Sequence, residues 1–151
     1  MRVSARSDYA VRALTEIAAR PGEPVTAEVV SRAQGIPLKF LLGILGDLRK
    51  AGVLRSQRGP AGGYVLARPA GEISVADVMR AVDGPLASVQ DARPEDVVYP
   101  GPAASLTKVW VAVRASLRAV LESVTLADLV SGELPPVVAE LTAQAEAWTR
   151  R

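Results

Sequence analysis

The 151 residues are enough for one domain with a dimerisation arm, and a hydrophobic content of 49% can supply a core. The chain contains no cysteine and no histidine, which excludes disulfides, cysteine-held iron–sulfur clusters and the usual zinc sites. Because the commonest catalytic side chains are missing as well, we expect a protein that is not an enzyme and carries no cofactor.

Charge is divided unevenly along the chain. Residues 1–68 hold eleven Lys or Arg against five Asp or Glu, residues 69–151 hold seven against eleven, and +6 with −4 gives the net charge of +2. A basic first half is typical of a protein that meets a polyanion, although an unevenly charged solvated surface explains the counts equally well. No apolar run approaches the roughly 20 residues of a membrane span, and the N-terminus lacks the order of a signal peptide. We therefore expect a cytoplasmic protein with no membrane partner.

The first fifty residues have the pattern of three helices. Apolar residues at helical spacing predict a helix over residues 7–20. Thr26 is placed to cap a short second helix, which Gly35 would end. Pro37 suits the first turn of a third helix over residues 37–51. A helix, a short helix, a glycine-containing turn and a longer helix together indicate a helix-turn-helix.

Two strand-like stretches follow, at residues 53–57 and 63–67. The segment between them, residues 58–63, is too rich in glycine for a helix and suits the tip of a hairpin. A hairpin directly after a helix-turn-helix is a wing. The sequence therefore predicts a winged helix-turn-helix DNA-binding region over residues 1–69.

Residues 70–104 are predicted to form a connecting helix and a regulatory loop. Ser74 and Asp77 have the spacing of a capping box, and Gly84 would end the helix. The loop over residues 85–104 holds four prolines and an acidic cluster, and loops of this length tend to be functional or disordered.

Residues 105–151 are predicted to form a dimerisation helix and a C-terminal tail. Apolar residues recur there at the spacing of heptad a and d positions: Leu106, Trp110, Val113, Leu117, Val120 and Val124. One helix buries such a seam either inside its own subunit or against a second copy, and we predict a homodimer. A short turn over residues 126–130, capped by Thr125, and an amphipathic helix over residues 137–148 would follow.

The third helix carries the first group of candidate DNA contacts. A recognition helix places its N-terminal outward side chains on base edges in the major groove, which here are Lys39, Leu42 and Gly43. At the other end, Arg49 and Lys50 are placed either to meet phosphates or only to complement the helix dipole.

The wing carries the second group. Glycines let the backbone approach a phosphate closely, and an arginine at a wing tip can enter a narrow minor groove. We expect Arg55, Arg58 and Arg68 to surround the glycine-rich turn, although an ordinary exposed hairpin with solubilising arginines is the alternative. The predicted DNA-binding residues of the wing are Arg55, Arg58, Gly59, Gly62, Gly63 and Tyr64.

These motifs resemble, in order, those of one known family. The strings R-K-A-G-V-L at residues 49–54 and R-G-P-A-G-G-Y at residues 58–64 are similar to the helix-to-wing signature of the Rrf-two family of winged-helix repressors. Further matches lie at residues 7–10, 81–84 and 124–129, so the resemblance covers about residues 2–131. It implies a recognition helix in the major groove, Arg58 in the minor groove and a long helix that exchanges contacts between subunits.

Three features depart from the family pattern. Its cluster-binding members hold three cysteines in the loop before the long helix, whereas residues 85–104 hold none, so we expect no iron–sulfur cluster and no other metal. Leu42 and Gly43 stand where polar residues are typical, which favours contact with thymine methyl groups or readout of DNA shape. Asp47 stands where a basic or neutral residue is usual, which removes one phosphate contact.

Together the patterns predict a mainly α (α+β) fold, a winged helix-turn-helix with a long C-terminal dimerisation helix. The predicted function is that of a bacterial, sequence-specific DNA-binding transcriptional regulator, most often a repressor, which acts as a homodimer on a palindromic operator. The alternative is a winged-helix adaptor that binds another protein and meets double-stranded DNA only incidentally.

Regulation is expected to enter at residues 85–104, through a small-molecule effector or a regulatory protein. Asp91 and Glu95 can accept hydrogen bonds, Arg93 can donate them, and Tyr99 offers a flat apolar face. The alternative is a passive loop that its prolines only stiffen.

Overall fold

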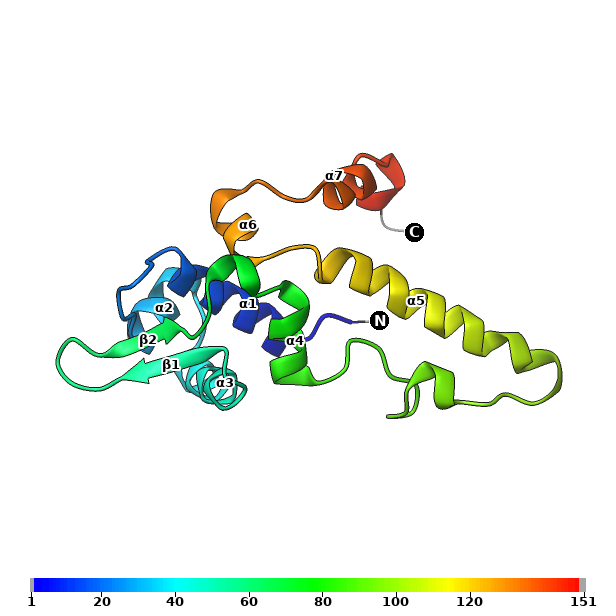
Figure 1. Ribbon diagram of the computed structural model, residues 1–151, viewed down its shortest axis with the longest axis horizontal. Coiled ribbons are helices and arrows are strands. Elements are labelled where there is room, and N and C mark those ends of the chain that lie inside the picture. Colours follow the sequence, from blue (N-terminus) through cyan, green and yellow to red (C-terminus); the bar gives the residue numbers. More distant parts are fainter. Residues whose placement is uncertain (1, 150–151) are drawn as a thin grey trace.

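The computed structural model describes residues 2–149 as a winged helix-turn-helix from which one long helix projects (Figure 1). The winged part consists of α1 (Ala5–Ala18), α2 (Ala27–Gln34), α3 (Leu38–Lys50), β1 (Leu54–Gln57) and β2 (Gly63–Leu66). The second half consists of α4 (Val75–Asp83), α5 (Leu106–Leu121), α6 (Leu126–Ser131) and α7 (Pro136–Thr142). This mainly helical fold with one small sheet confirms the predicted fold class. No helix within residues 2–149 is long and apolar enough to cross a membrane.

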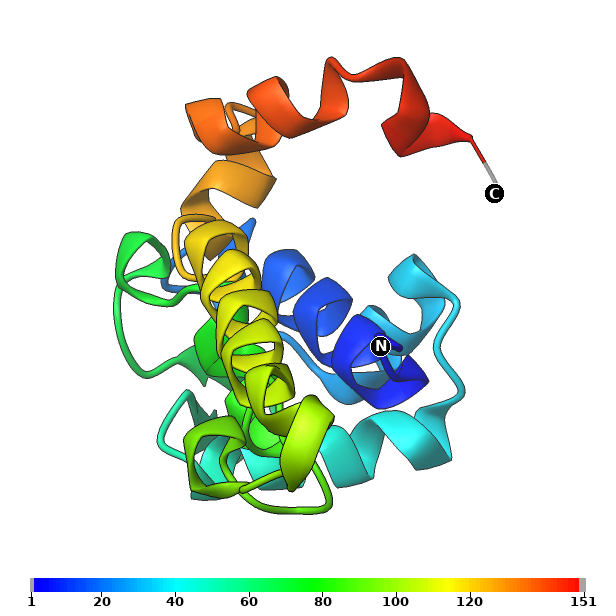
Figure 2. The same ribbon diagram turned by 90° about the vertical axis from the view of Figure 1, so that its right-hand side faces the viewer.

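α1 lies at the centre of the helical unit and contacts α2, α3, α4 and α6 (Figure 2). Its inner face is formed by Ala10, Ala13, Leu14 and Ile17, which are at most 2% exposed. The helix begins at Ala5 and not, as predicted, at residue 7, because the Ser4 side chain accepts a hydrogen bond from the Ser7 backbone N–H and caps it.

A carboxylate at the end of α4 holds the start of α1. The Ser7 hydroxyl, which is buried, donates a hydrogen bond of 2.6 Å to Asp83, and the Ser4 hydroxyl donates to the same carboxylate. Burial by itself would raise the pKa of Asp83, but the two hydrogen bonds and the charge of Arg6 outweigh it and lower this pKa. The ionised form of Asp83 therefore stabilises the contact between the two helices.

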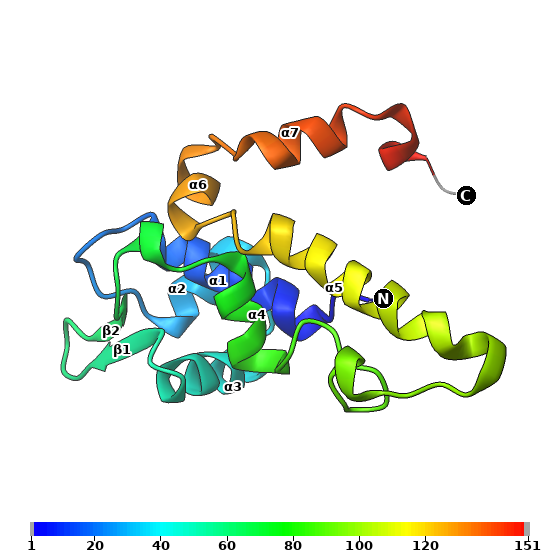
Figure 3. The same cartoon turned by 45° about the vertical axis from the view of Figure 1, so that its right-hand side comes forward.

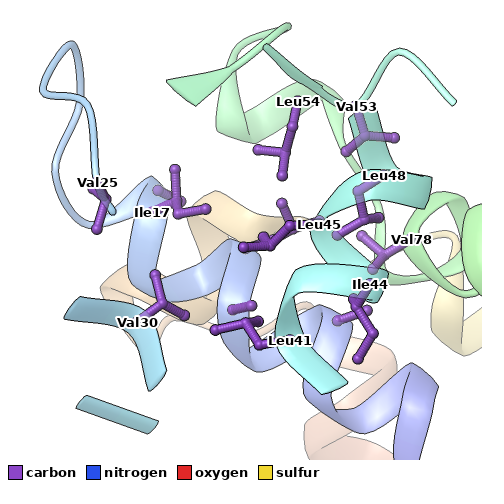
Figure 4. Packing of buried hydrophobic residues seen from close by; sticks show 14 of the residues in the cluster. Ile17, Val25, Val30, Leu41, Ile44, Leu45, Leu48, Val53, Leu54 and Val78 are labelled. Carbon is purple, nitrogen blue, oxygen red and sulfur yellow. The ribbon is translucent and has the colours of Figure 1, made fainter. Parts of the chain in front are cut away.

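The helix-turn-helix follows the predicted signals. The Thr26 side chain accepts a hydrogen bond of 3.3 Å from the Val29 N–H, and Gly35 ends α2 in the left-handed conformation with φ of 62°. These positions favour threonine and glycine, respectively, because one needs a side-chain acceptor and the other lacks a Cβ that would clash. α3 then packs on α1 through four buried residues, which Figure 4 labels: Leu41, Ile44, Leu45 and Leu48.

The core does not stop at the predicted boundary at residue 69. Ile73, Val78 and Leu126 are fully buried in the same hydrophobic cluster as the winged part, and Figure 4 shows Val78 beside Leu48 and Ile44. The chain segments before α4 and α6 pair antiparallel, since Leu126 N–H donates to the Ile73 carbonyl at 3.0 Å. The division at residue 69 therefore does not separate two cores.

α5 begins at Leu106 as predicted, but the prediction that it reaches Val124 is wrong. The helix ends at Leu121, and Val124 lies in the link to α6, where it is 7% exposed. The Val75 N–H donates a hydrogen bond of 2.9 Å to the Val124 carbonyl, so this link is fixed to the start of α4 and Val124 is buried within its own subunit. The heptad pattern included Val124 because the spacing of apolar residues does not reveal whether a residue is buried by its own subunit or by a second copy.

The prediction of one helix over residues 137–148 is also wrong. α7 ends at Thr142, and Ala145–Trp148 form a separate 3-10 turn. The Trp148 indole N–H donates a hydrogen bond of 2.7 Å to the Thr142 carbonyl, a group left free at the end of α7. A seven-residue helix with no buried side chain gains too little from packing to continue further.

Residues 85–104 fold against α5. Val89 and Ala92 exchange two backbone hydrogen bonds of 3.0 Å around Gln90 and Asp91, whose φ values of 53° and 63° are those of a type I′ turn. Two 3-10 turns follow, at Pro94–Asp96 and Gly101–Ser105. This segment therefore consists of short turns, and its 3-10 turns pack on α5.

Candidate nucleic-acid interface

One side of α3 is open to solvent beside the wing (Figure 3). Lys39, Leu42 and Gly43, the predicted base contacts, are all exposed there. The side chain of Phe40, which the sequence analysis did not single out, is 69% exposed, and that of Leu42 is 48% exposed. Two exposed apolar side chains at the start of a recognition helix can contact thymine methyl groups.

The far end of α3 is connected to its neighbours by charged side chains. An Arg49 guanidinium N–H lies 3.5 Å from the Ser56 hydroxyl on β1, and the Lys50 ammonium lies 3.8 Å from the Asp47 carboxylate. Asp47 also accepts a hydrogen bond from Arg6 of α1. The unusual acid at position 47 therefore holds α1 and α3 together, while Arg49 and Lys50 remain exposed.

The wing tip is a tight turn that requires glycine. The Gly62 N–H donates a hydrogen bond of 2.9 Å to the Gly59 carbonyl, which closes a four-residue turn with Pro60 at its second position. Gly59 has a φ of 101°, and a Cβ on Gly62 would lie 2.4 Å from the Gln57 carbonyl oxygen. Arg58 is exposed and immediately precedes this turn in the chain.

The base of the wing is attached to the segment before α2. Tyr64 and Val25 exchange backbone hydrogen bonds of 2.8 and 2.9 Å, and a Cβ on Gly63 would lie 2.7–2.9 Å from the Val25 backbone. Tyr64 itself is half-buried against the core. Gly63 and Tyr64 therefore position the wing, and their predicted contact with DNA remains a prediction. The role of Val25 was not visible in the sequence because its partner lies 39 residues away along the chain.

Of the three arginines expected around the turn, only Arg58 lies there. Arg55 is exposed within β1, opposite Val65 in the strand register. Arg68 lies beyond β2, where its guanidinium is 3.9 Å from the Asp77 carboxylate of α4. The expectation that Arg55 and Arg68 lie at the wing tip is wrong, because β1 and β2 each hold four residues and place both arginines at or beyond the base of the hairpin. The contact of Arg55 with DNA stays a prediction.

In the second half, the structure brings three of the four predicted effector residues together. Asp91, Arg93 and Glu95 line one pocket of about 630 Å³ against α4 and α5, whereas Tyr99 is not among the residues that line it. Glu95 is paired with Arg114 of α5 at 2.6 Å. The hydrogen bond from Arg114 is the main cause that holds the pKa of Glu95 below its ordinary value.

The predicted dimer seam lies on a helix that is only half covered. No side chain of α5 is fully buried, and Val109 is 50% exposed. A shallow apolar groove of about 630 Å³ runs along the open face and is lined by Val109, Ala112, Val113, Ser116, Leu117, Val120, Leu121 and Leu141. Trp110 instead faces the wall formed by residues 85–94. The seam residues therefore divide between two sides of α5.

A tri-helical unit, an exposed third helix and a glycine-built wing with a basic tip define a winged helix-turn-helix DNA-binding regulator of transcription. The sequence profile of the Rrf2 family, described as that of an iron-dependent transcriptional regulator, matches residues 3–132. The chain belongs to the Rrf2 family of transcriptional regulators.

Relatives and solved structures agree with this assignment. A helix-turn-helix-type transcriptional regulator of Mycobacterium tuberculosis is 54% identical over 142 residues, which cover 93% of this chain and 88% of that protein. The structure of CymR, the global cysteine regulator of Bacillus subtilis, matches with a TM-score of 0.75 at 27% identity, over 87% of this chain and 98% of that chain. IscR of T. potens matches with a TM-score of 0.70 at 30% identity, over 100% and 93% of the two chains.

The family description refers to iron, but the side chains of this chain do not suit an iron site. Thiolates hold iron–sulfur clusters and imidazoles commonly ligate iron, and the sequence has no cysteine and no histidine. Within residues 2–149, no group of three or more acidic side chains is arranged to hold a metal ion. The pocket between α4, α5 and the preceding loop instead has four arginines in its lining: Arg80, Arg93, Arg114 and Arg118. Cationic side chains disfavour a bound cation, so an iron centre does not fit there.

Proposed function

We propose that this regulator is a homodimeric repressor that binds a palindromic operator of double-stranded DNA in the bacterial cytoplasm, where the chromosome lies. The observation that carries the dimer is the incomplete burial of α5. This 16-residue helix projects from the winged unit and buries no side chain fully (Figure 1). An exposed apolar face of this kind marks an interaction site, and a second copy offers a self-complementary surface.

The apolar side of α5 has the spacing that a helix–helix contact needs. Val109, Val113, Leu117 and Val120 follow one another at intervals of three and four residues and line the same groove. These intervals place them on one stripe of the helix. The predicted seam is thereby revised: Val109 joins it, Val124 leaves it, and Trp110 lies to the side.

DNA recognition is assigned to α3 and the wing. Lys39, Phe40, Leu42 and Gly43 are exposed at the N-terminal end of α3, which is the end that a recognition helix directs at base edges. Arg49, Lys50 and Arg55 are exposed along the far end of α3 and on β1, where they can neutralise phosphates. Arg58 at the wing tip is assigned to the minor groove. In a two-fold dimer both sets meet successive major grooves on one side of the duplex.

Regulation is assigned to residues 85–104, which stand between the DNA-binding unit and α5. An effector there changes operator affinity only if it binds the two states of the protein unequally. The adaptor alternative lacks support, because the family and the relatives are DNA-binding regulators.

The double substitution Val113→Glu and Leu117→Glu tests the dimer. It places charges in the apolar stripe, so light scattering after size exclusion should give the mass of a monomer, or aggregates. Ala115→Glu is the matched control, since residue 115 is exposed on the opposite side of α5. Operator binding, measured by fluorescence anisotropy with a duplex selected from genomic fragments, should be lost only in the double variant. Dimers of unchanged strength in that variant would show that α5 packs within one subunit.

Repression is tested separately by transcription in vitro from a promoter that contains the selected operator. The regulator should lower the yield of transcript, and a rise in yield would identify an activator.

A further inference from the structure

We propose that the pocket between α4, α5 and residues 85–95 binds a small organic anion, a molecule with one carboxylate or phosphate group and an apolar body. The regulatory role of such a ligand rests on the function proposed above, but its binding does not. The proposal is built on a cluster of guanidinium groups, an adjoining apolar cavity and one buried donor without a partner.

The guanidinium groups come from three separate segments. Arg80 belongs to α4, Arg93 to the loop, and Arg114 and Arg118 to successive turns of α5, and all four line one pocket of about 630 Å³. The carboxylates that line the same pocket are those of Asp91 and Glu95. Four guanidinium groups and two carboxylates therefore line a cavity that is large enough for a small molecule.

Two of these arginines already have close partners. Arg114 is paired with Glu95 at 2.6 Å and holds the loop against α5, and its side chain is only 15% exposed. Arg80 is hydrogen-bonded to Glu122, and it also lies 3.8 Å from Asp77. These two arginines therefore shape the pocket.

The other two arginines are less fully paired. The Arg118 Nε lies 3.9 Å from the Glu122 carboxylate, which already accepts from Arg80. No ion pair within residues 2–149 involves Arg93, which is exposed and lines the same pocket as Arg118. An anion that contacts both side chains would receive charge-assisted hydrogen bonds from each, and the planar guanidinium suits carboxylate and phosphate equally.

An apolar cavity of about 440 Å³ adjoins this charged pocket. Its walls include Leu86, Val89, Pro94, Trp110 and Val113, and residues 85–88 line both spaces. Because both spaces lie against this one short segment, we assign the charged head of the ligand to the first space and its apolar body to the second. This arrangement favours an anion with an apolar body over a simple inorganic anion.

The buried donor belongs to the Trp110 indole. Its Nε1–H is shielded from solvent and finds no hydrogen-bond partner among residues 2–149. Buried polar groups are almost always hydrogen-bonded, so a donor of this kind points to an acceptor that the protein itself does not supply. Trp110 lines the apolar cavity that adjoins the charged pocket, so a ligand that enters this cavity can bring an acceptor to the indole.

The position of the pocket explains how the ligand would act. Arg80 belongs to the helix that packs on α1 and α3, whereas Arg114 and Arg118 belong to the helix assigned to the dimer. A ligand that bridges the two helices changes the angle between the winged unit and α5. In a dimer, this angle determines the distance between the two recognition helices, which must match the repeat of DNA.

Two anionic probes test the site: benzoate and phenyl phosphate. Benzyl alcohol serves as the uncharged counterpart and inorganic phosphate as the head group alone. The protein carries Trp148→Phe, so that Trp110 is the remaining tryptophan and its fluorescence reports on the pocket. Both anions should change the emission saturably, whereas benzyl alcohol and inorganic phosphate should bind at least tenfold more weakly.

The variant Arg93→Gln with Arg118→Gln should weaken the binding of the anions by about ten- to a hundredfold, because two charge-assisted hydrogen bonds are lost. Lys108→Gln is the matched control, since it removes a positive charge from α5 outside the pocket and should leave binding unchanged. Thermal unfolding of each variant establishes that the fold is retained. Absence of saturable binding to the wild-type site at millimolar concentration, or equal binding by the double arginine variant, would overturn the proposal. Equal binding of benzyl alcohol would overturn the anionic class.

Operator affinity of the same samples separates this inference from the proposed function. A saturable anion site in a protein that binds no operator supports the inference and contradicts the proposed function. A protein that binds the operator but has no anion site contradicts the inference and supports the proposed function.

Discussion

Replacement of Arg58 by alanine is the most direct test of DNA recognition by the wing. The side chain is exposed at the entrance of the turn over residues 59–62 and lies outside the core, so its removal leaves the fold intact. Gly59 and Gly62 are required by the conformation of the turn, and Arg58 is not, so the substitution leaves the turn in place. We therefore expect the effect of the substitution to be on DNA binding and not on stability.

The size of the effect follows from the two-fold symmetry. A good specific arginine contact is worth about 1–3 kcal/mol. A homodimer inserts two wings, so the substitution removes two such contacts and weakens the binding free energy by about 2–6 kcal/mol. This corresponds to a decrease in affinity of about 30-fold to about 10⁴-fold. If the two side chains also neutralise phosphates, the slope of log affinity against log salt falls by about 2.

Fluorescence anisotropy with a labelled operator duplex, titrated at several salt concentrations, measures both quantities. Lys108→Ala is the control for net charge, because it removes one positive charge from the end of α5 farthest from the wing (Figure 1). Arg58→Lys retains the charge and separates a charge effect from a specific fit of the guanidinium. An affinity of Arg58→Ala equal to that of wild type, or to that of Lys108→Ala, would refute the assignment of the wing.

Three further predictions concern stability and composition. Leu126→Ala should lower the free energy of unfolding by about 2–5 kcal/mol in urea titrations, because Leu126 is fully buried, whereas the exposed Leu134→Ala should change it little; equal effects would remove α6 from the core. Asp83 has a lowered pKa, so its ionised form stabilises the protein above its ordinary pKa of 3.8 and this stabilisation is lost as the pH falls further. Asp83→Asn should therefore flatten the acid side of the stability profile, and an unchanged profile would contradict the role of the contact with Ser4 and Ser7. Elemental analysis should find neither iron nor zinc at stoichiometric amounts, since thiolate and imidazole ligands are missing, and one iron per subunit would contradict this.

Much of the candidate interface could be predicted because its signals are local. Thr26 and Gly35 bound α2, and Thr125 caps α6 together with Asp128, within three or four residues of the groups that they satisfy. Gly59 and Gly62 likewise specify the turn, one through its positive φ and the other through a close approach to a carbonyl five residues earlier. Such interactions are written into consecutive residues, so a single sequence is sufficient to identify them.

The absent residues are equally informative without any structure. A chain without cysteine and histidine cannot build a thiolate-held cluster whatever its fold, which sets it apart from the iron-dependent description of its family. This conclusion depends on the chemistry of the ligands and not on their placement.

The partners of individual side chains were decided only by the tertiary structure. Val124 is apolar at a heptad position, yet it is buried within its own subunit, in a link whose backbone pairs with Val75, 49 residues earlier. Nothing in the sequence pairs Glu95 with Arg114, and only the folding of the loop onto α5 makes them an ion pair. Local sequence determines which backbone conformation is favourable, but burial and charge pairing depend on which distant segments the fold brings together. For this reason the sequence was sufficient to predict the winged helix, and the four-arginine pocket beside α5 became visible only once the chain was folded.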